Sequence, residues 1–255
     1  MADDPDASPR DIEKTVERDP AITAKILKVA NSAFYGHSNV NNVGRAVSLL
    51  GMNVMRSLVV SIAFQQVIGN RVNAASFDKV EYWRHSLAVG VAARILGKLR
   101  IPMKAEELFV GGLMHDIGML VLDRFLPAEF DQAMQYARSS NIPLHEVEQE
   151  VMGFDHAAVG GLLADRWGLS TMMKRGIEFH HRPIEDGDYY ETTCILSVAN
   201  TLAHQCGFTN SQLVADLEIS PEVAEAVGLP VEQFGSIRDV MVVEVVRAQE
   251  AFHIH

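Results

Sequence analysis

Apolar residues recur every three or four positions along this chain of 255 residues, and no stretch shows sustained alternation of apolar and polar residues. Spacing of three and four places apolar side chains on one face of an α-helix, whereas a half-buried strand requires alternation with period two. The start signals are also helical, because pairs such as Asp19-Pro20 combine an N-capping side chain with a proline suited to the first turn. The sequence therefore predicts an all-α fold.

Capping residues, prolines and glycines divide the N-terminal part of the chain into separate helices. The predicted elements are a helix from the capping box at residues 8–11, one from Asp19 to about Phe34, a short one between Asn42 and Gly51, and one from Asn53 to about Gly69. The polar stretch GNRVNAAS (69–76) is the clearest internal break. We therefore expect two packed helical lobes, the first over residues 1–70.

The second lobe is predicted over residues 71–206. Its elements are a long helix from the Ser76 cap to about Lys98, one continuous helix through residues 107–125, and helices near 127–140, 143–152, 155–168, 170–181 and 190–206. Residues 182–190 are typical of a loop. Residues 207–255 add helices near 221–228 and 236–252, and the face expected to pack on the second lobe is Val240, Val243, Val246 and Ala251.

Charge and composition narrow the classes of function. The formal net charge of −11 disfavours binding to nucleic acid or to anionic membranes, because both require a basic surface. Charged residues interrupt every apolar run before it reaches the length of a membrane span, so we expect no membrane helix. The first residues are acidic and polar, unlike a secretory signal, and two cysteines are too few for a disulfide scaffold. These features predict a cytoplasmic protein.

Ten histidines occur, and several lie on or beside apolar helical faces. His85 shares a predicted helix face with Ala88 and Ala92, and His115 precedes Asp116 inside the apolar run GGLMHDIGML. The histidines in such positions are His85, His115, His156, His180, His181 and His204. We interpret the remaining four as incidental, because they follow a glycine, lie on a polar helix or end the chain: His37, His145, His253 and His255.

Two interpretations of these histidines remain open from the residues alone. A single histidine on an apolar face is most often a core residue whose ring nitrogens are satisfied by hydrogen bonds. Several inward histidines and a carboxylate on different helices of one bundle are the groups that build metal sites. Imidazole and carboxylate ligands suit iron, manganese, zinc or nickel. The alternatives are therefore a set of core histidines and a divalent metal centre.

Longer motifs carry a resemblance to a known family. The chain resembles the HDOD domain in the segments DPAITAKILKVANSAFYG (19–36), AVSLLGMNVMRSLVV (46–60), YWRHSLAVGVAARIL (82–96) and ELFVGGLMHDIGMLVL (107–122). The histidine motifs WRHS, MHDIG, DHAAVG and FHHRP resemble those of the HD superfamily of metal-dependent phosphohydrolases. The resemblance covers about residues 11–205 and implies that the second lobe is an HD-type helical bundle.

The resemblance also implies roles at a centre with one or two divalent ions. By similarity to the related HD-GYP enzymes, Asp116 would bridge two ions, and it would be the catalytic residue if the protein is an enzyme. The terminal ligands would be His115, His156, His180 and His181. His85 would lie in or next to the ligand shell. Asn200 stands where HD enzymes carry a final aspartate, and its amide oxygen would be a neutral ligand.

The chain departs from the enzymes of this superfamily in ways that affect charge. Met119 stands where a lysine is expected after HDIG, and no Gly-Tyr-Pro tripeptide follows the histidine pair at 180–181. Because Asn200 is neutral, Asp116 is the one carboxylate assigned to the site, and two divalent ions would lack compensation. The candidates for supplying a further negative charge are Asp186 and Glu178.

Two functions follow from this pattern. The first is a bacterial HDOD module of signalling or regulation with a partly degenerate metal site, acting mainly through contacts with regulatory or signalling proteins. The alternative is a metal-dependent phosphohydrolase, a phosphodiesterase that acts on nucleotides or cyclic dinucleotides. A phosphate-containing ligand is a candidate in both cases. Dispersal of the predicted ligands over the fold would contradict the metal site.

Overall fold

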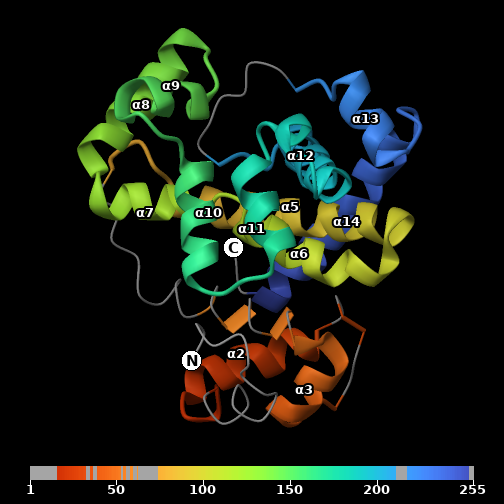
Figure 1. The fold of residues 1–255 in the computed structure, drawn as a ribbon. Coiled ribbons are helices and arrows are strands. Elements are labelled where there is room, and N and C mark those ends of the chain that lie inside the picture. Colours follow the sequence, from red (N-terminus) through yellow and green to blue (C-terminus); the bar gives the residue numbers. More distant parts are fainter. Residues whose placement is uncertain are drawn as a thin grey trace.

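The computed structural model describes residues 16–32, 35–36, 39–52, 54–55, 58–59, 62, 74–210 and 217–252, and every regular element in these ranges is a helix. The predicted all-α class is confirmed. Helices α2 (Pro20–Ala30) and α3 (Val43–Leu50) lie together on one side of the remaining helices, as Figure 1 shows. This group is the described part of the predicted N-terminal lobe.

The remaining helices surround the long helix α5 (Lys79–Arg100), against which α6, α12 and α14 pack. The other helices are α6 (Ala105–Met114), α7 (Ile117–Phe125), α8 (Pro127–Ser140), α9 (Leu144–Met152), α10 (His156–Arg166), α11 (Thr171–Phe179), α12 (Tyr190–Gln205), α13 (Pro221–Val227) and α14 (Gln233–Phe252). Short 3-10 helices occupy Pro102–Lys104 and Pro183–Glu185, the second within the predicted loop. Glycines let α5 and α6 approach closely, because a Cβ at Gly112 would lie 2.8 Å from the Cα of Gly90.

Side-chain caps explain where several helices begin and end. Asp19 accepts hydrogen bonds from the backbone of α2, and Asn42 accepts one from the backbone of α3, as the sequence predicts. The prediction that α2 continues to Phe34 is wrong, because Asn31 ends it: its amide donates to the carbonyl of Leu27 and exchanges two hydrogen bonds with Val40.

The start predicted for α5 is also wrong. Asp78 caps this helix by accepting from the amides of Val80 and Glu81, while the backbone amide of Ser76 donates to Asp131 on α8. Both residues are good capping types within a few positions of each other. The contact between Ser76 and α8 leaves Asp78 as the residue that caps the helix.

The predicted continuous helix through residues 107–125 is wrong at one point. The chain turns at His115 and Asp116, so α6 ends at Met114 and α7 begins at Ile117. The turn lets α7 pack against α10, where a Cβ on Gly118 would clash with the backbone of His156. The apolar residues on both sides of His115 and Asp116 conceal the turn, because both helices are buried on most of their faces.

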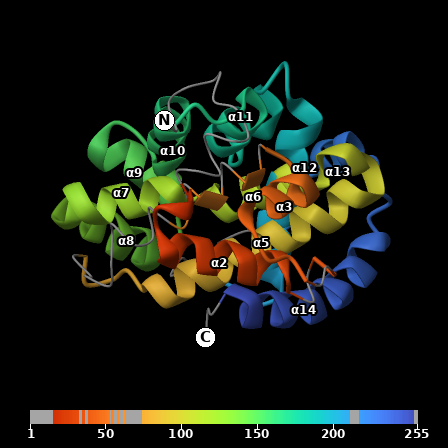
Figure 2. The same cartoon turned by 90° about the horizontal axis from the view of Figure 1, so that it is seen from below.

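One apolar core connects the two groups of helices. The ring of Tyr35 packs edge-on against Phe109 of α6 with ring centroids 6.2 Å apart, and α14 contacts both α5 and α2 (Figure 2). The face of α14 that packs inward is Phe234, Ile237, Met241, Val245 and Ala248. The predicted face is therefore wrong, because about half of the surface of Val240, Val243 and Val246 is exposed. The side chain of Ala251 lies outside the described part.

Two predicted helices fall wholly or partly outside the described residues. The helix at the capping box of residues 8–11 lies outside them. Of the helix from Asn53 to about Gly69, residues 54–55, 58–59 and 62 are described, and all are helical. Across the described ranges, no helix combines the length and apolar character that a membrane crossing requires.

Candidate metal centre

The side chain of Asp116 lies at the centre of a cluster of imidazoles and is 1% exposed. Its Oδ1 lies 3.2 Å from the Nε2 of His156 and 3.4 Å from the Nε2 of His180. Its Oδ2 lies 3.2 Å from the Nε2 of His115 and 3.6 Å from the Nε2 of His85. Both carboxylate oxygens therefore face imidazole nitrogens from different helices.

Helix ends bring these residues together. His115 and Asp116 form the turn between α6 and α7, His156 is the first residue of α10, and His180 directly follows α11. His85, by contrast, lies in the interior of a helix, α5. The residues form two overlapping groups that share Asp116, and ligand atoms within each group lie within 4.8 Å of one another: Asp116, His156, His180 and His181; and His85, His115 and Asp116.

Hydrogen bonds on the far side of each ring fix which nitrogen faces Asp116. The Nδ1 atoms of His85, His115 and His180 donate to backbone carbonyls at 2.8, 2.7 and 2.7 Å. In a neutral ring this leaves Nε2 as the unprotonated nitrogen with its lone pair toward the carboxylate. These rings therefore have the tautomer and orientation of metal ligands, whose other nitrogen is held by an outer partner.

Burial keeps two of these rings neutral. It lowers the pKa of His85 well below its ordinary value and also lowers the pKa of His180. Burial alone would raise the pKa of Asp116, but the surrounding histidines, His115 first, lower it well below its ordinary value. Asp116 is thus an ionised carboxylate beside the neutral rings of His85 and His180, and that combination favours a cation.

Glu148 on α9 is a functional residue that sequence reasoning missed. It is fully buried, and its Oε2 accepts hydrogen bonds from the backbone amide of His156 at 2.8 Å and from its Nδ1 at 2.6 Å. Burial alone would lower the pKa of His156, but the charge of Glu148 and its hydrogen bond raise it well above its ordinary value. Glu148 directly follows the buried Val147, and that position beside the core is the signal that was available.

The further negative charge beside the centre therefore comes from Glu148. The two carboxylates proposed for this role from the sequence, Asp186 and Glu178, have other partners. Asp186 accepts from the hydroxyl of Thr193 at 2.6 Å and from Arg175 at 3.1 Å. Glu178 lies 3.7 Å from the same arginine. Both candidate carboxylates from the sequence, Asp186 and Glu178, are instead paired with Arg175.

Replacing Glu148 with glutamine is expected to weaken divalent metal binding about 10- to 100-fold, as is typical when the outer partner of a ligating histidine is lost. Glutamine keeps the size of the side chain but removes the charge that orients His156. The measurement is the dissociation constant of Mn²⁺ by isothermal titration calorimetry. Glu146→Gln, an exposed residue on the same helix, is the matched control, and equal affinities of the two variants would contradict the role of Glu148.

Two further histidines lie at the edges of the cluster. His145 stacks on His181 with ring centroids 4.1 Å apart and planes inclined by 9°. The interpretation of His145 as incidental is therefore wrong, since α9 brings it to the site. His204 of α12 lies against His85 with ring centroids 4.5 Å apart. His181 itself lies with its Nε2 2.9 Å from the Nε2 of His156.

Asn200 lies on α12 and Asn210 follows this helix, and of the two it is Asn210 that contacts Asp116. Asn210 donates a hydrogen bond from Nδ2 to the Oδ2 of Asp116. Asn200, the ligand predicted from the sequence, has an Oδ1 that is buried and has no hydrogen-bond partner among the described residues. Asn210 follows the end of the resemblance, and no local pattern marks a single asparagine in a loop as a site residue.

The donor set fits a divalent metal. Within the described part of the chain, the Oδ1 of Asp116 and the Nε2 of His180 are buried without a hydrogen-bond partner, although they lie 3.4 Å apart. Unpartnered buried acceptors are costly, and a cation between them would satisfy both. Imidazole and carboxylate donors are those of iron, manganese, zinc and nickel sites. The six residues that the structure brings together are His85, His115, Asp116, His156, His180 and His181.

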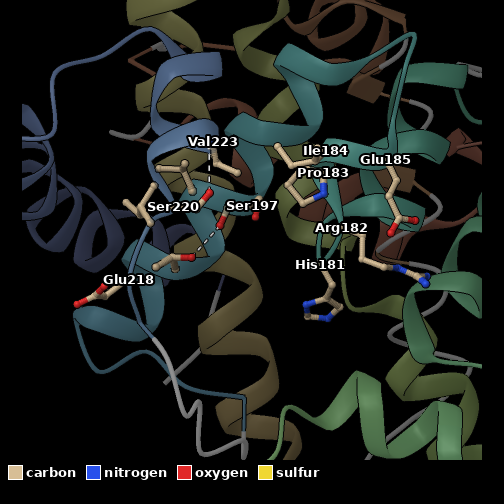
Figure 3. Close-up of a pocket in the computed structure, with 12 residues that line it drawn as sticks. His181, Arg182, Pro183, Ile184, Glu185, Ser197, Glu218, Ser220 and Val223 are labelled. Atoms are coloured by element: carbon tan, nitrogen blue, oxygen red, sulfur yellow. Dashed lines mark hydrogen bonds between the residues drawn. The ribbon is translucent and has the colours of Figure 1, made fainter.

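A pocket of about 310 Å³ adjoins the cluster at His181 (Figure 3). His181 and Arg182 lie on one side of it, and Glu218 and Ser220 lie on the other. Arg182 is engaged in an ion pair with Asp155 at 3.2 Å. A molecule in this pocket would reach the His156–His180–His181 side of the cluster.

Comparisons with known proteins give the family and the fold. A sequence model of the HDOD domain matches residues 1–183. A protein of Treponema pallidum (strain Nichols) is 24% identical over 201 residues, which are 78% of this chain and 38% of that protein. The chain thus spans about two fifths of the length of this relative.

Solved structures share the fold over nearly the whole chain. A proposed signal transduction protein of Marinobacter aquaeolei VT8 matches with a TM-score of 0.77 and 21% identity, covering 99% of this chain and 56% of that one. A proposed phosphohydrolase of Shewanella amazonensis SB2B matches with a TM-score of 0.71 and 24% identity, covering 98% and 90%. Similarity at this level of identity establishes a common all-α fold.

Proposed function

Because the chain belongs to the HDOD domain family, we propose that it is a regulatory signalling module built around a buried centre for one or two divalent metal ions. The observation that carries this proposal is the carboxylate of Asp116, whose oxygens lie 3.2–3.6 Å from the Nε2 atoms of four histidines. The ions would be iron, manganese, zinc or nickel, in line with the ligand types.

The residues of the centre would connect separate elements of the fold. Asp116 with His85 and His115 would hold one ion between α5 and the α6–α7 turn, and Asp116 with His156, His180 and His181 would hold a second between α10 and α11. A bound ion supplies positive charge that polarises a phosphoryl or carbonyl oxygen. Glu148 would keep His156 oriented toward the centre.

The surroundings of the centre favour regulation over phosphate hydrolysis. Met119 is buried where a lysine would provide a cation for phosphate. The pocket beside His181 is lined by one arginine, which is paired with Asp155, and by Glu185 and Glu218. Negative charge among the lining residues disfavours a polyanionic substrate. We therefore propose contacts with regulatory or signalling proteins as the main mode of action, and the signal transduction protein with the same fold supports this choice.

A second candidate function is a metal-dependent phosphohydrolase. The observation in its favour is that the pocket opens beside His181, so a phosphodiester could reach the ligand cluster. In that case Asp116 would be the catalytic residue that holds the ions, and Arg182 would contact the phosphate after leaving Asp155. The proposed phosphohydrolase with the same fold is consistent with this alternative.

One experiment separates the two functions. The Mn²⁺-loaded protein and its Asp116→Asn variant are incubated with bis(p-nitrophenyl) phosphate and with cyclic dinucleotides, and the products are measured. The regulatory module predicts equal background rates for both proteins, although the wild type binds metal. Turnover that is lost in Asp116→Asn would contradict that function and establish the phosphohydrolase.

A further inference from the structure

Asn210 occupies an unusual position in the segment that follows α12. The residue is 2% exposed, its Nδ2 donates to the Oδ2 of Asp116, and the same nitrogen lies 3.7 Å from the sulfur of Met119. Its Oδ1 is buried and has no hydrogen-bond partner among the residues that the structure describes. A buried carboxamide with one unsatisfied end, placed against the central carboxylate of a metal centre, requires a physical reason.

The backbone beside Asn210 is held by the cluster itself. The carbonyl of Phe208 accepts from the Nδ1 of His85 at 2.8 Å, and the amide of Phe208 donates to Ala203 of α12 at 3.0 Å. The segment is thus fixed against α12 on one side and against a predicted metal ligand on the other. This anchoring brings Asn210 to the Oδ2 of Asp116, the oxygen that also faces His85 and His115.

We infer that Asn210 is a metal ligand of this centre and completes the His85–His115 side of Asp116 with its amide oxygen. A half-turn of the carboxamide exchanges Nδ2 and Oδ1 without movement of the backbone. Without an ion the nitrogen donates to Asp116, and with an ion the oxygen replaces it, so the unsatisfied oxygen gains its partner. The inference rests on the proposed metal centre and assigns it a ligand beyond the matched residues 1–183.

The assignment makes the two sides of the centre unequal. An ion on the His85–His115 side would be enclosed by Asn210, as in structural sites whose ligand shell is full. An ion on the side of His156, His180 and His181 would face the pocket at His181 and keep an open position. The enclosed ion would then stabilise the fold, and the ion beside the pocket would be the one that contacts ligands or partner proteins.

The alternative ligand is Asn200, which the sequence predicts from the position of the missing aspartate. Its Oδ1 is also buried without a hydrogen-bond partner in the described ranges. Of the two, however, it is Asn210 that donates a hydrogen bond to Asp116. The two asparagines therefore form a matched pair of the same chemistry, and substitution of each distinguishes the two assignments.

The test uses the full chain as wild type and as Asn210→Ala, Asn210→Asp and Asn200→Ala. Mn²⁺ affinity and stoichiometry are measured by competition with a chelator and by electron paramagnetic resonance. For Asn210→Ala we expect the affinity for one ion to fall about tenfold or more, while the affinity for the other ion stays unchanged. For Asn200→Ala we expect both affinities to equal those of the wild type. For Asn210→Asp, which keeps the shape and adds charge, we expect binding at least as tight as in the wild type.

Each other result overturns the inference. Wild-type affinity in Asn210→Ala, or loss of an ion in Asn200→Ala alone, would show that Asn210 is not a ligand. If Asn210→Ala fails to fold by circular dichroism, weaker binding by Asn210→Asp overturns the assignment and tighter binding supports it. A wild-type chain that binds no Mn²⁺ would overturn the proposed metal centre as well, so the two failures are distinguishable.

Discussion

Replacing Gly118 with alanine is expected to destabilise the fold by more than about 3 kcal/mol, because α7 and α10 touch through their backbones at this position. A Cβ on Gly118 would lie 1.9 Å from the carbonyl oxygen of His156 and 3.0 Å from the amide nitrogen of Gly160. Both neighbours are backbone atoms and cannot rotate away. The two helices would have to separate, and His156 at the start of α10 would move away from Asp116.

The measurement is thermal and urea unfolding followed by circular dichroism, with Gly111→Ala as the control. A Cβ at Gly111 meets only the side chain of Leu196, at 3.5 Å, which is an ordinary contact. Alanine also has a higher helix propensity than glycine, so this variant is expected to remain within about 1 kcal/mol of the wild type. Equal stabilities of Gly118→Ala and Gly111→Ala would contradict the close approach of α7 and α10.

Replacing Asp116 with asparagine is expected to abolish tight binding of both ions, because this carboxylate is shared by the two ligand groups. An amide keeps the size of the side chain but supplies no negative charge to balance the ions. In the wild type, a metal concentration about 1,000-fold above the dissociation constant adds about 4 kcal/mol to the free energy of unfolding. For a domain of this size that gain raises the melting temperature by roughly 10 °C.

The measurement is the melting temperature with excess Mn²⁺ and with a chelator. Asp116→Asn should melt at one temperature in both conditions. Asp188→Asn, which changes an exposed carboxylate, should keep the full metal-dependent rise of the wild type. A rise of the same size in Asp116→Asn would mean that the ions bind elsewhere on the protein.

The helical fold could be predicted because local signals agree with the tertiary structure over most of the chain. Asp19 and Asn42 cap their helices as their residue types predict. The turn at His115 and Asp116 could not be predicted, because both flanking helices are buried on most of their faces and neither turn position is a glycine or proline. The packed face of α14 was misassigned for a related reason: valines occur on both its buried and its exposed faces.

The sequence predicts those residues of the site that belong to recognisable motifs. The histidine motifs and Asp116 lie together in the structure, at helix ends that converge on α5. His145 and Asn210 reach the cluster through packing of α9 and of the segment after α12, and tertiary contacts of this kind leave no local pattern. Glu148 is marked in the sequence by its position directly after the buried Val147. The role of Asn200 as a ligand stays a prediction, which the substitutions at both asparagines test.

We propose above all that the buried cluster around Asp116 holds divalent metal ions. The most direct measurement is X-ray diffraction at the manganese absorption edge, with crystals of the full chain grown in MnCl₂. We expect one or two anomalous peaks bonded to the carboxylate of Asp116 and to Nε2 atoms of the surrounding histidines. A map with no anomalous peak at Asp116, in crystals where the histidine rings keep the positions described, would contradict the claim and leave them as core residues.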